Sequence, residues 1–349
     1  MRPVRMVRLA AVAAITALVL AGCGKDDNTG GGGNGTAQKK TLKVGLAYDV
    51  GGRGDKSFND AAAAGLERVK KELNLKINEL SARLDETDAD KAQRLTLLAD
   101  GGYNPIIAVG FAYGKALGTV AKAHPDIKFA IIDDASNTLP NVANLVFAEE
   151  QGSFLVGAAA ALKSTTGKVG FVGGVDTPLL RKFQAGYAAG VKQVKPTATV
   201  LVKYLTQAPD FSGFNDPAKG KAAATGMYDG GADVVYAAAG GSGTGVFQAA
   251  QAAGKLAIGV DSDQYNTVKP ESLRDVIMTS MLKRVDTAVF DFVKDVADDK
   301  FAAGEKRFDL KSDGVGYSTS GGKVDDIKSK LEDLKQQIID GKITVPATP

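Results

Sequence analysis

The sequence predicts an α/β protein made of two similar Rossmann-like lobes, each with a parallel sheet covered by helices on both faces. From Leu42 onward, short runs of β-branched and other apolar residues alternate with segments of helical length, the order that gives parallel sheets. The length of 349 residues suits two domains of about 100–200 residues each. Residues 43–46 (KVGL) are echoed by residues 168–171 (KVGF), which indicates that a second α/β unit begins near residue 168.

The amino terminus, residues 1–22, has the pattern of a bacterial export signal. A start that is rich in arginine precedes an apolar run over residues 9–21, which is too short to span a membrane. The run ends at Leu20-Ala21-Gly22-Cys23, which resembles a lipobox, so we expect cleavage before Cys23 and a diacylglyceryl group on its thiol. The alternative is a plain secretory signal with an unrelated cysteine. Residues 23–40 are rich in glycine and predict a flexible tether, so we expect a body that is lipid-anchored at the extracytoplasmic face of the cell membrane.

Composition excludes several classes of site and partner. The chain has one Cys and one His, which rules out an internal disulfide and makes Cys- or His-rich metal sites untenable. Removal of residues 1–22 takes away three Arg and leaves equal numbers of basic and acidic side chains. A neutral body does not suit nucleic acid, which requires a basic excess. We therefore expect no nucleic-acid partner, no cofactor and no metal.

The elements follow in alternating order along the body. Strands are predicted at residues 42–48, 76–80, 106–110, 128–133, 142–147, 168–173, 199–205, 233–239, 256–261 and 276–282. Helices are predicted at residues 59–71, 89–99, 113–123, 150–163, 179–194, 217–228, 245–253 and 284–297. Residues 324–340 have apolar side chains at helical spacing and predict a further helix that packs on a lobe.

Acidic side chains follow three of the predicted strands. Asp49, Asp133 and Asp261 each end an apolar run, and ligands of open parallel sheets bind beyond the carboxyl ends of strands. A single Asp at such a place can equally be a helix cap or a turn residue. Three of them favour a binding site, because carboxylates without a metal cluster or a basic clamp suit neutral polyhydroxy ligands.

A glycine-rich turn, residues 240–245 (GGSGTG), stands between a strand and a helix. The turn departs from the dinucleotide fingerprint, and the chain has no P-loop. Close approach of the backbone to a ligand at Gly240 is the functional interpretation, and a tight strand–helix turn is the structural one.

Two phenylalanines occupy polar, glycine-flanked helix entries. Phe58 precedes the first predicted helix and Phe214 precedes the helix that begins at Pro217. Such positions suit a hydrophobic staple, or two rings that close on the faces of a planar ligand, one from each lobe.

These motifs resemble the basic membrane protein (BMP) family, whose best-understood members are the purine nucleoside receptor lipoproteins of bacterial ABC importers. The resemblance runs from about residue 42 to the carboxyl terminus. It is carried by residues 49–59 (DVGGRGDKSFN), 214–220 (FNDPAKG), 259–264 (GVDSDQ) and 281–286 (MLKRVD).

The resemblance implies a type I periplasmic-binding-protein fold with a ligand cleft between two lobes and three chain crossings. The first lobe would span residues 41–147 with part of about 262–300, and the second would span 148–261 with part of the segment to 349. The residues that match the family's nucleoside contacts are Asp49, Phe58, Asn59, Asp133, Phe214, Gly240, Asp261 and Lys283, with Phe183 as a further candidate and Asp134 as the alternative to Asp133.

The expected function is capture of a nucleoside, in the first instance a purine nucleoside, and its delivery to a membrane permease by a monomeric receptor that makes and breaks no bond. Phe58 and Phe214 would stack on the base, Asn59 and Asp133 would read its edge, and Asp261 with Lys283 would hold the ribose. Two rivals remain open: a sugar or polyol receptor of the same fold, and a surface nucleoside hydrolase, which would need a divalent metal held by several carboxylates. A sensor or adhesin that uses the same cleft is a third possibility.

Overall fold

The computed structural model describes residues 42–349. The predicted signal, the lipid attachment at Cys23 and the tether lie outside these residues. Within the described part of the chain, no helix is long and apolar enough to cross a membrane.

The first lobe contains a six-stranded sheet in which every strand is parallel to its neighbours. Its order is β11-β5-β4-β3-β1-β2. The strands are β1 (Lys43–Ala47), β2 (Lys76–Leu80), β3 (Ile106–Ala108), β4 (Phe129–Ile132), β5 (Val142–Phe147) and β11 (Gly304–Phe308). The helices are α1 (Phe58–Glu72), α2 (Asp88–Asp100), α3 (Gly114–Ala123) and α9 (Val285–Ala297), with the 3-10 turn η1 (Phe111–Tyr113).

The second lobe repeats this sheet order as β12-β10-β9-β8-β6-β7, with only β12 antiparallel to its neighbour. The strands are β6 (Lys168–Asp176), β7 (Thr199–Gln207), β8 (Val234–Ala238), β9 (Leu256–Asp261), β10 (Ile277–Lys283) and β12 (Val315–Tyr317). The helices are α4 (Glu149–Lys163), α5 (Pro178–Val194), α6 (Pro217–Asp229), α7 (Gly243–Ala253), α8 (Gln264–Thr267) and α10 (Lys328–Ile339), with the 3-10 turns η2 (Phe211–Phe214), η3 (Gly240–Ser242), η4 (Glu271–Val276) and η5 (Asp325–Ile327). The echoed segments at residues 43 and 168 are β1 and β6, which hold the same place in the two sheets.

Helices cover both faces of each sheet because successive strand residues point to opposite faces. In β3, Ile107 packs with α1 and α9, whereas Ile106 and Ala108 pack with α2 and α3. In the second lobe, α4 and α5 cover one face and α6 and α7 the other. Strands buried on both faces produce the continuous apolar runs from which the fold class was predicted.

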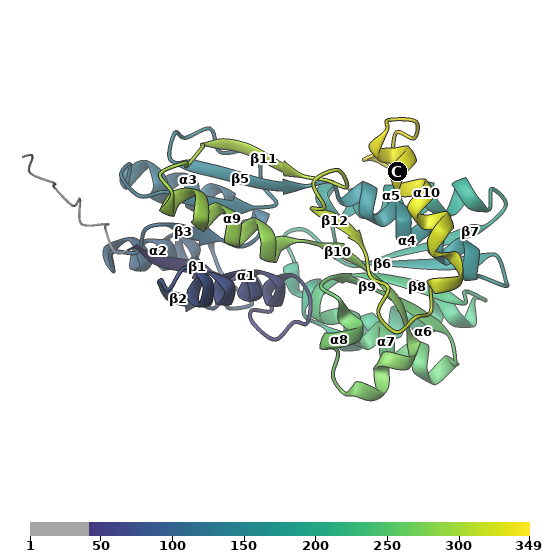
Figure 1. Ribbon diagram of the computed structural model, residues 1–349. Coiled ribbons are helices and arrows are strands. Elements are labelled where there is room, and N and C mark those ends of the chain that lie inside the picture. The colour runs from purple at the N-terminus through teal and green to yellow at the C-terminus, as the bar shows by residue number, and fades with distance from the viewer. Residues whose placement is uncertain (1–41) are drawn as a thin grey trace, which may run out of the picture. The chain divides into compact units, whose positions relative to one another are not determined.

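Over the described residues 42–349 the chain crosses between the lobes three times, as the predicted fold requires. The crossings follow β5, β10 and β11. All three lie at the β5/β11 and β10/β12 side of the sheets, so β2 and β7 are the strands farthest from them. Figure 1 shows the late elements α9 and β11, in green, among the blue elements of the first lobe. The carboxyl ends of the parallel strands, where the predicted site lies, face the region between the lobes.

The sequence did not predict the strands β11 and β12 or the short helix α8. β11 is an edge strand in which only Phe308 is buried, so its sequence (GEKRF) has no apolar run, and β12 has three residues. The segment that returns to the first lobe is 285–308, α9 with β11, whereas β10 at 277–283 belongs to the second sheet. The sequence-based expectation, part of about 262–300, includes α9 and does not extend to β11.

Candidate ligand-binding site

The structure brings all the predicted site residues to one cavity between the lobes. Residues of both lobes line this cavity. Its walls include Asp49, Phe58, Asn59, Asp133, Phe183, Phe214, Gly240, Asp261 and Lys283. Asp134 does not line the cavity: its carboxylate accepts hydrogen bonds from the amide and hydroxyl of Ser136, at 2.9 and 2.6 Å.

The two lobes contribute equivalent strand ends to this cavity. Asp133 follows β4 and Asp261 ends β9, the corresponding strand of the second sheet, and both have left-handed backbones with φ of 67° and 63°. Asp tolerates this conformation better than most residues. Gly240 follows β8 with φ of 55°, and a Cβ there would lie 2.9 Å from the carbonyl oxygen of Phe214. The glycine therefore lets the backbone of Phe214 approach the end of the sheet.

Among the residues that the structure describes, Lys283 is the only cation lining the cavity, and it is almost completely buried. Its Nζ lies 2.6 Å from Asp133 Oδ2 and 3.2 Å from Glu149 Oε1, and the three side chains are 1%, 4% and 1% exposed. The rings of Phe58, Phe147 and Phe183 also surround Nζ, with centroids 5.0–5.5 Å away. Lys283 therefore forms a buried ion pair with Asp133, and Glu149 adds a second carboxylate.

The electrostatics of the cavity are set by an excess of carboxylates in a desolvated place. Burial would lower the pKa of Lys283, but the carboxylates of Asp133, Glu149 and Asp261 outweigh burial and raise it. Burial raises the pKa of Asp133 against the opposing effect of Lys283, and raises that of Asp261 as well. Burial also raises the pKa of Asp49 to about 6. The buried Oδ1 of Asp133 has no hydrogen-bond partner within residues 42–349, so it can accept a hydrogen bond from a ligand.

Asn59 holds the loop that carries Asp49. Its Oδ1 accepts from the amide of Asp49 at 3.0 Å, and its Nδ2 donates to the carbonyl of Val50 and to Asp55 Oδ2. Both amide hydrogens are therefore engaged within the protein, which leaves one lone pair of Oδ1 for a ligand. Asn59 thus has a positioning role that its sequence context did not reveal.

Hydrogen bonds join the lobes beside the cavity. Ser57 Oγ donates to Asp261 Oδ2 at 2.6 Å, Ser262 Oγ donates to the carbonyl of Ser57 at 2.9 Å, and Gln264 Nε2 donates to the carbonyl of Lys56 at 2.9 Å. Asp261 is therefore oriented by a residue of the opposite lobe. These contacts describe a molecule whose lobes are closed on each other at this point.

The aromatic wall at Phe214 is fixed by the second lobe's own packing. The ring of Phe214 lies against Gly174, where any side chain would collide with it. Asp216 caps the following helix by accepting a hydrogen bond from the amide of Lys219. Pro217 takes the first helical position, where a backbone N–H would have no partner within the helix. Phe58 is the first residue of α1 and half-buried.

Sequence reasoning missed Asp55, Ser57, Phe111 and Glu149. Asp55 accepts from the amides of Ser57, Asn59 and Asp60, and a capping pattern before α1 could have indicated it. Glu149 begins α4, where an acidic residue is unremarkable next to the helix dipole. Nothing local in the sequence indicates that its carboxylate meets Lys283, because the two residues are far apart in the chain.

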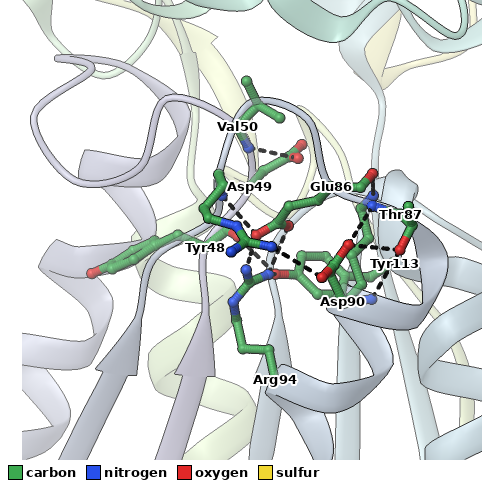
Figure 2. A network of polar contacts seen from close by, with 10 residues as sticks. Tyr48, Asp49, Val50, Glu86, Thr87, Asp90, Arg94 and Tyr113 are labelled. Carbon is green, nitrogen blue, oxygen red and sulfur yellow. Dashed lines mark hydrogen bonds and ion pairs between the residues drawn. The ribbon is translucent and has the colours of Figure 1, made fainter.

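A second polar network supports the first lobe's side of the cavity (Figure 2). Arg94 forms an ion pair with Glu86 and donates to the hydroxyl of Tyr113 at 2.6 Å. That hydroxyl donates to the backbone carbonyl of Tyr48 at 2.9 Å, next to Asp49. Arg94, Glu86 and Tyr113 are buried or nearly so, which ties the loop after β2 and the turn after β3 to the end of β1.

Comparison with known proteins agrees with this geometry. A family model described as ABC transporter substrate-binding protein PnrA-like matches residues 42–349. The ABC transporter nucleoside-binding protein BmpA of Lactococcus lactis is 35% identical, over 98% of this chain and 99% of that protein. An uncharacterised lipoprotein of Pyrococcus horikoshii is 36% identical, over 88% of this chain and 76% of that protein.

Solved structures agree on the fold. An ABC transporter solute-binding protein of Aeropyrum pernix superposes with a TM-score of 0.75 and 31% identity, covering 87% of this chain and 94% of that one. A solute-binding protein of Conexibacter woesei, 24% identical, has a TM-score of 0.71 over 88% of this chain and 99% of that one. The fold is the type I periplasmic-binding-protein fold, and the chain belongs to the Bmp family of PnrA-like ABC transporter substrate-binding proteins.

Proposed function

We propose that this protein is a lipid-anchored, monomeric receptor that captures a nucleoside, in the first instance a purine nucleoside, between its lobes and delivers it to an ABC permease. The observation that carries the proposal is the convergence of four phenylalanines and five acidic or basic side chains, from distant parts of the sequence, on one cavity. The nucleoside-binding relative in Lactococcus lactis supports the ligand class.

In this proposal Phe58 and Phe214 stack on the two faces of the base. Base–aromatic stacking contributes about 1–3 kcal/mol for each base, and it tolerates different bases. Asp133, through its unpartnered Oδ1, accepts a hydrogen bond from the base edge, and the remaining lone pair of Asn59 Oδ1 can accept a second. Asp49, Gly240 and Phe183 complete the wall around the base.

The ribose lies next to Asp261 and Lys283. A carboxylate accepts hydrogen bonds from vicinal hydroxyls, while the ammonium group donates to their oxygens. Lys283 stays charged because Asp133 and Glu149 compensate it, so a neutral ligand need not bring a counterion. In the hydrolase alternative a divalent cation would sit among these carboxylates, but here the ammonium group of Lys283 occupies that place.

Anchoring and delivery complete the proposal. The lipid on Cys23 holds the protein at the extracytoplasmic face of the cell membrane, and relatives from Pyrococcus are named lipoproteins. Hinge motion at the three crossings opens and closes the cavity, and the ligand favours the closed state through its contacts to both lobes.

Titration calorimetry on the purified protein tests the proposal. We expect saturable 1:1 binding of inosine, guanosine or adenosine and no heat from ribose or glucose. Asp133→Asn should weaken nucleoside binding, whereas the matched control Asp134→Asn should leave it unchanged, because Asp134 lies outside the cavity. If the protein bound a monosaccharide and no nucleoside, the nucleoside proposal would be wrong and the ligand would be a sugar. Release of free base from inosine would identify a hydrolase instead.

A further inference from the structure

A groove lies at the edge of the sheets that is farthest from the three crossings, and we take it as the mouth of the cavity because the lobes can separate most at that edge. The loops that follow β2 and β7 meet there in a groove. The first lobe contributes residues 84–88 and Lys91, and the second contributes residues 209–211. When two lobes rotate about a hinge, displacement grows with distance from the hinge, so contacts at this mouth are separated more than any others.

Two phenylalanines, which we call the mouth pair, join the lobes at this place. Phe111 of the first lobe lines the cavity, and Phe211 of the second lobe lines the mouth groove. Their rings meet edge to face, with centroids 5.7 Å apart and an interplanar angle of 77°. The contact therefore lies between the cavity and the groove, and it exists only while the lobes are closed.

Phe111 is held rigidly on the first lobe. It opens the 3-10 turn η1, whose last residue, Tyr113, is fully buried. The hydroxyl of Tyr113 donates to the carbonyl of Tyr48 and accepts from Arg94, which also pairs with Glu86 in the loop of residues 84–88 (Figure 2). Phe111 thus moves with the end of β1 and with Asp49 as one unit.

Phe211 is tied to the ligand site of the second lobe. Phe211 begins η2 and Phe214 ends it, so the ring at the mouth and the ring in the cavity wall belong to one short turn. Asp210 caps this turn through the amide of Ser212 at 2.9 Å. A ligand that packs on Phe214 therefore also fixes the position of Phe211.

We propose that Phe111 is a further ligand-contacting residue, which forms the mouth-side wall of the cavity, and that Phe211 is a positioning residue, which holds Phe111 from the opposite lobe and slows ligand release. The inference rests on the proposed function for the identity of the ligand, but not for the geometry of the mouth pair. A contact that forms after the lobes close affects dissociation more than association.

Stopped-flow kinetics with inosine as the probe test the inference. Phe211→Ala should raise the dissociation rate by about 2- to 12-fold, the range for loss of one aromatic pair, and change the association rate little. Phe211→Tyr keeps the ring and should behave like the wild type. Phe111→Ala should raise the rate at least as much, and the double variant should exceed Phe111→Ala by less than the effect of Phe211→Ala alone.

A matched control is Phe301→Ala, because Phe301 also makes an edge-to-face pair, with Phe292, but within the first lobe alone. This variant should leave the dissociation rate unchanged. Equal dissociation rates in the wild type and Phe211→Ala, or strictly additive effects of the two mouth substitutions, would overturn the inference. If the wild type bound a monosaccharide and no nucleoside, only the proposed ligand class would be wrong. The dissociation rates of that sugar from the wild type and from Phe211→Ala would then test the role of the mouth pair.

Discussion

Replacement of Lys283 by methionine should destabilise the protein more than any other single lysine substitution. The change keeps most of the side-chain volume but removes the ammonium group that lies 2.6 Å from Asp133 and 3.2 Å from Glu149, so the buried carboxylate of Asp133 loses its counterion. Removal of one partner of a buried ion pair costs about 3–5 kcal/mol, because the remaining charge stays desolvated. We expect the free energy of unfolding at about pH 8 to fall by that amount.

The loss of stability in Lys283→Met should depend on pH, and the direction of this dependence follows from the carboxylate of Asp133. Without Lys283 the pKa of Asp133 in the folded state rises further above its unfolded value, so the folded protein binds a proton that the unfolded chain does not. Stability then decreases as pH rises, and the deficit of Lys283→Met should be larger at about pH 8 than at about pH 5. A second substitution, Asp133→Asn, should recover part of it at pH 8.

Urea unfolding followed by circular dichroism measures both effects. The control is Lys182→Met, because Lys182 Nζ lies 3.6 Å from the same Glu149 but is 33% exposed, and such a pair contributes about 0–1 kcal/mol. A loss for Lys283→Met below about 1 kcal/mol, or an equal loss at both pH values, would refute the electrostatic reasoning.

Three further outcomes are expected. Ser57→Ala removes the hydroxyl that orients Asp261 across the lobes, so calorimetry should show nucleoside binding weakened by about tenfold, while Ser57→Thr keeps the bond. Nucleoside affinity should rise between about pH 5 and 7.5, because Asp49, with a pKa of about 6, accepts hydrogen bonds best when ionised; an affinity that is flat over this range would exclude the residue. Gly190→Ala in α5 should lower the free energy of unfolding, measured with urea, by about 1–3 kcal/mol, because the new Cβ would collide with the backbone of α4. The control Gly226→Ala in α6 has open space around the new Cβ and should be neutral or stabilising by up to about 1 kcal/mol.

The elements that the sequence predicted well are those whose buried side chains form a run or a periodic pattern of apolar residues. The ten predicted strands are present because parallel strands covered on both faces are apolar throughout. β11 has no such apolar pattern, because this polar edge strand is held by backbone hydrogen bonds to β5 and not by burial of its side chains. The return of the chain at 285–308 was therefore placed only approximately.

The candidate site divides in the same way. Asp49, Asp133 and Asp261 could be found because the carboxyl ends of parallel strands converge by topology, and Asp133 rather than Asp134 lines the cavity because it directly follows β4. Lys283 entered through family resemblance alone. Glu149 and the mouth pair could not be found, since each depends on a contact between segments that only the folded chain brings together.

A crystal structure of the protein with inosine most directly tests the central claim. We predict that the purine ring lies between Phe58 and Phe214, that its edge reaches Asp133, and that the ribose hydroxyls contact Asp261 and Lys283. Density for inosine outside the inter-lobe cavity, or a ligand in the cavity with no ring between the two phenylalanines, would contradict the claim.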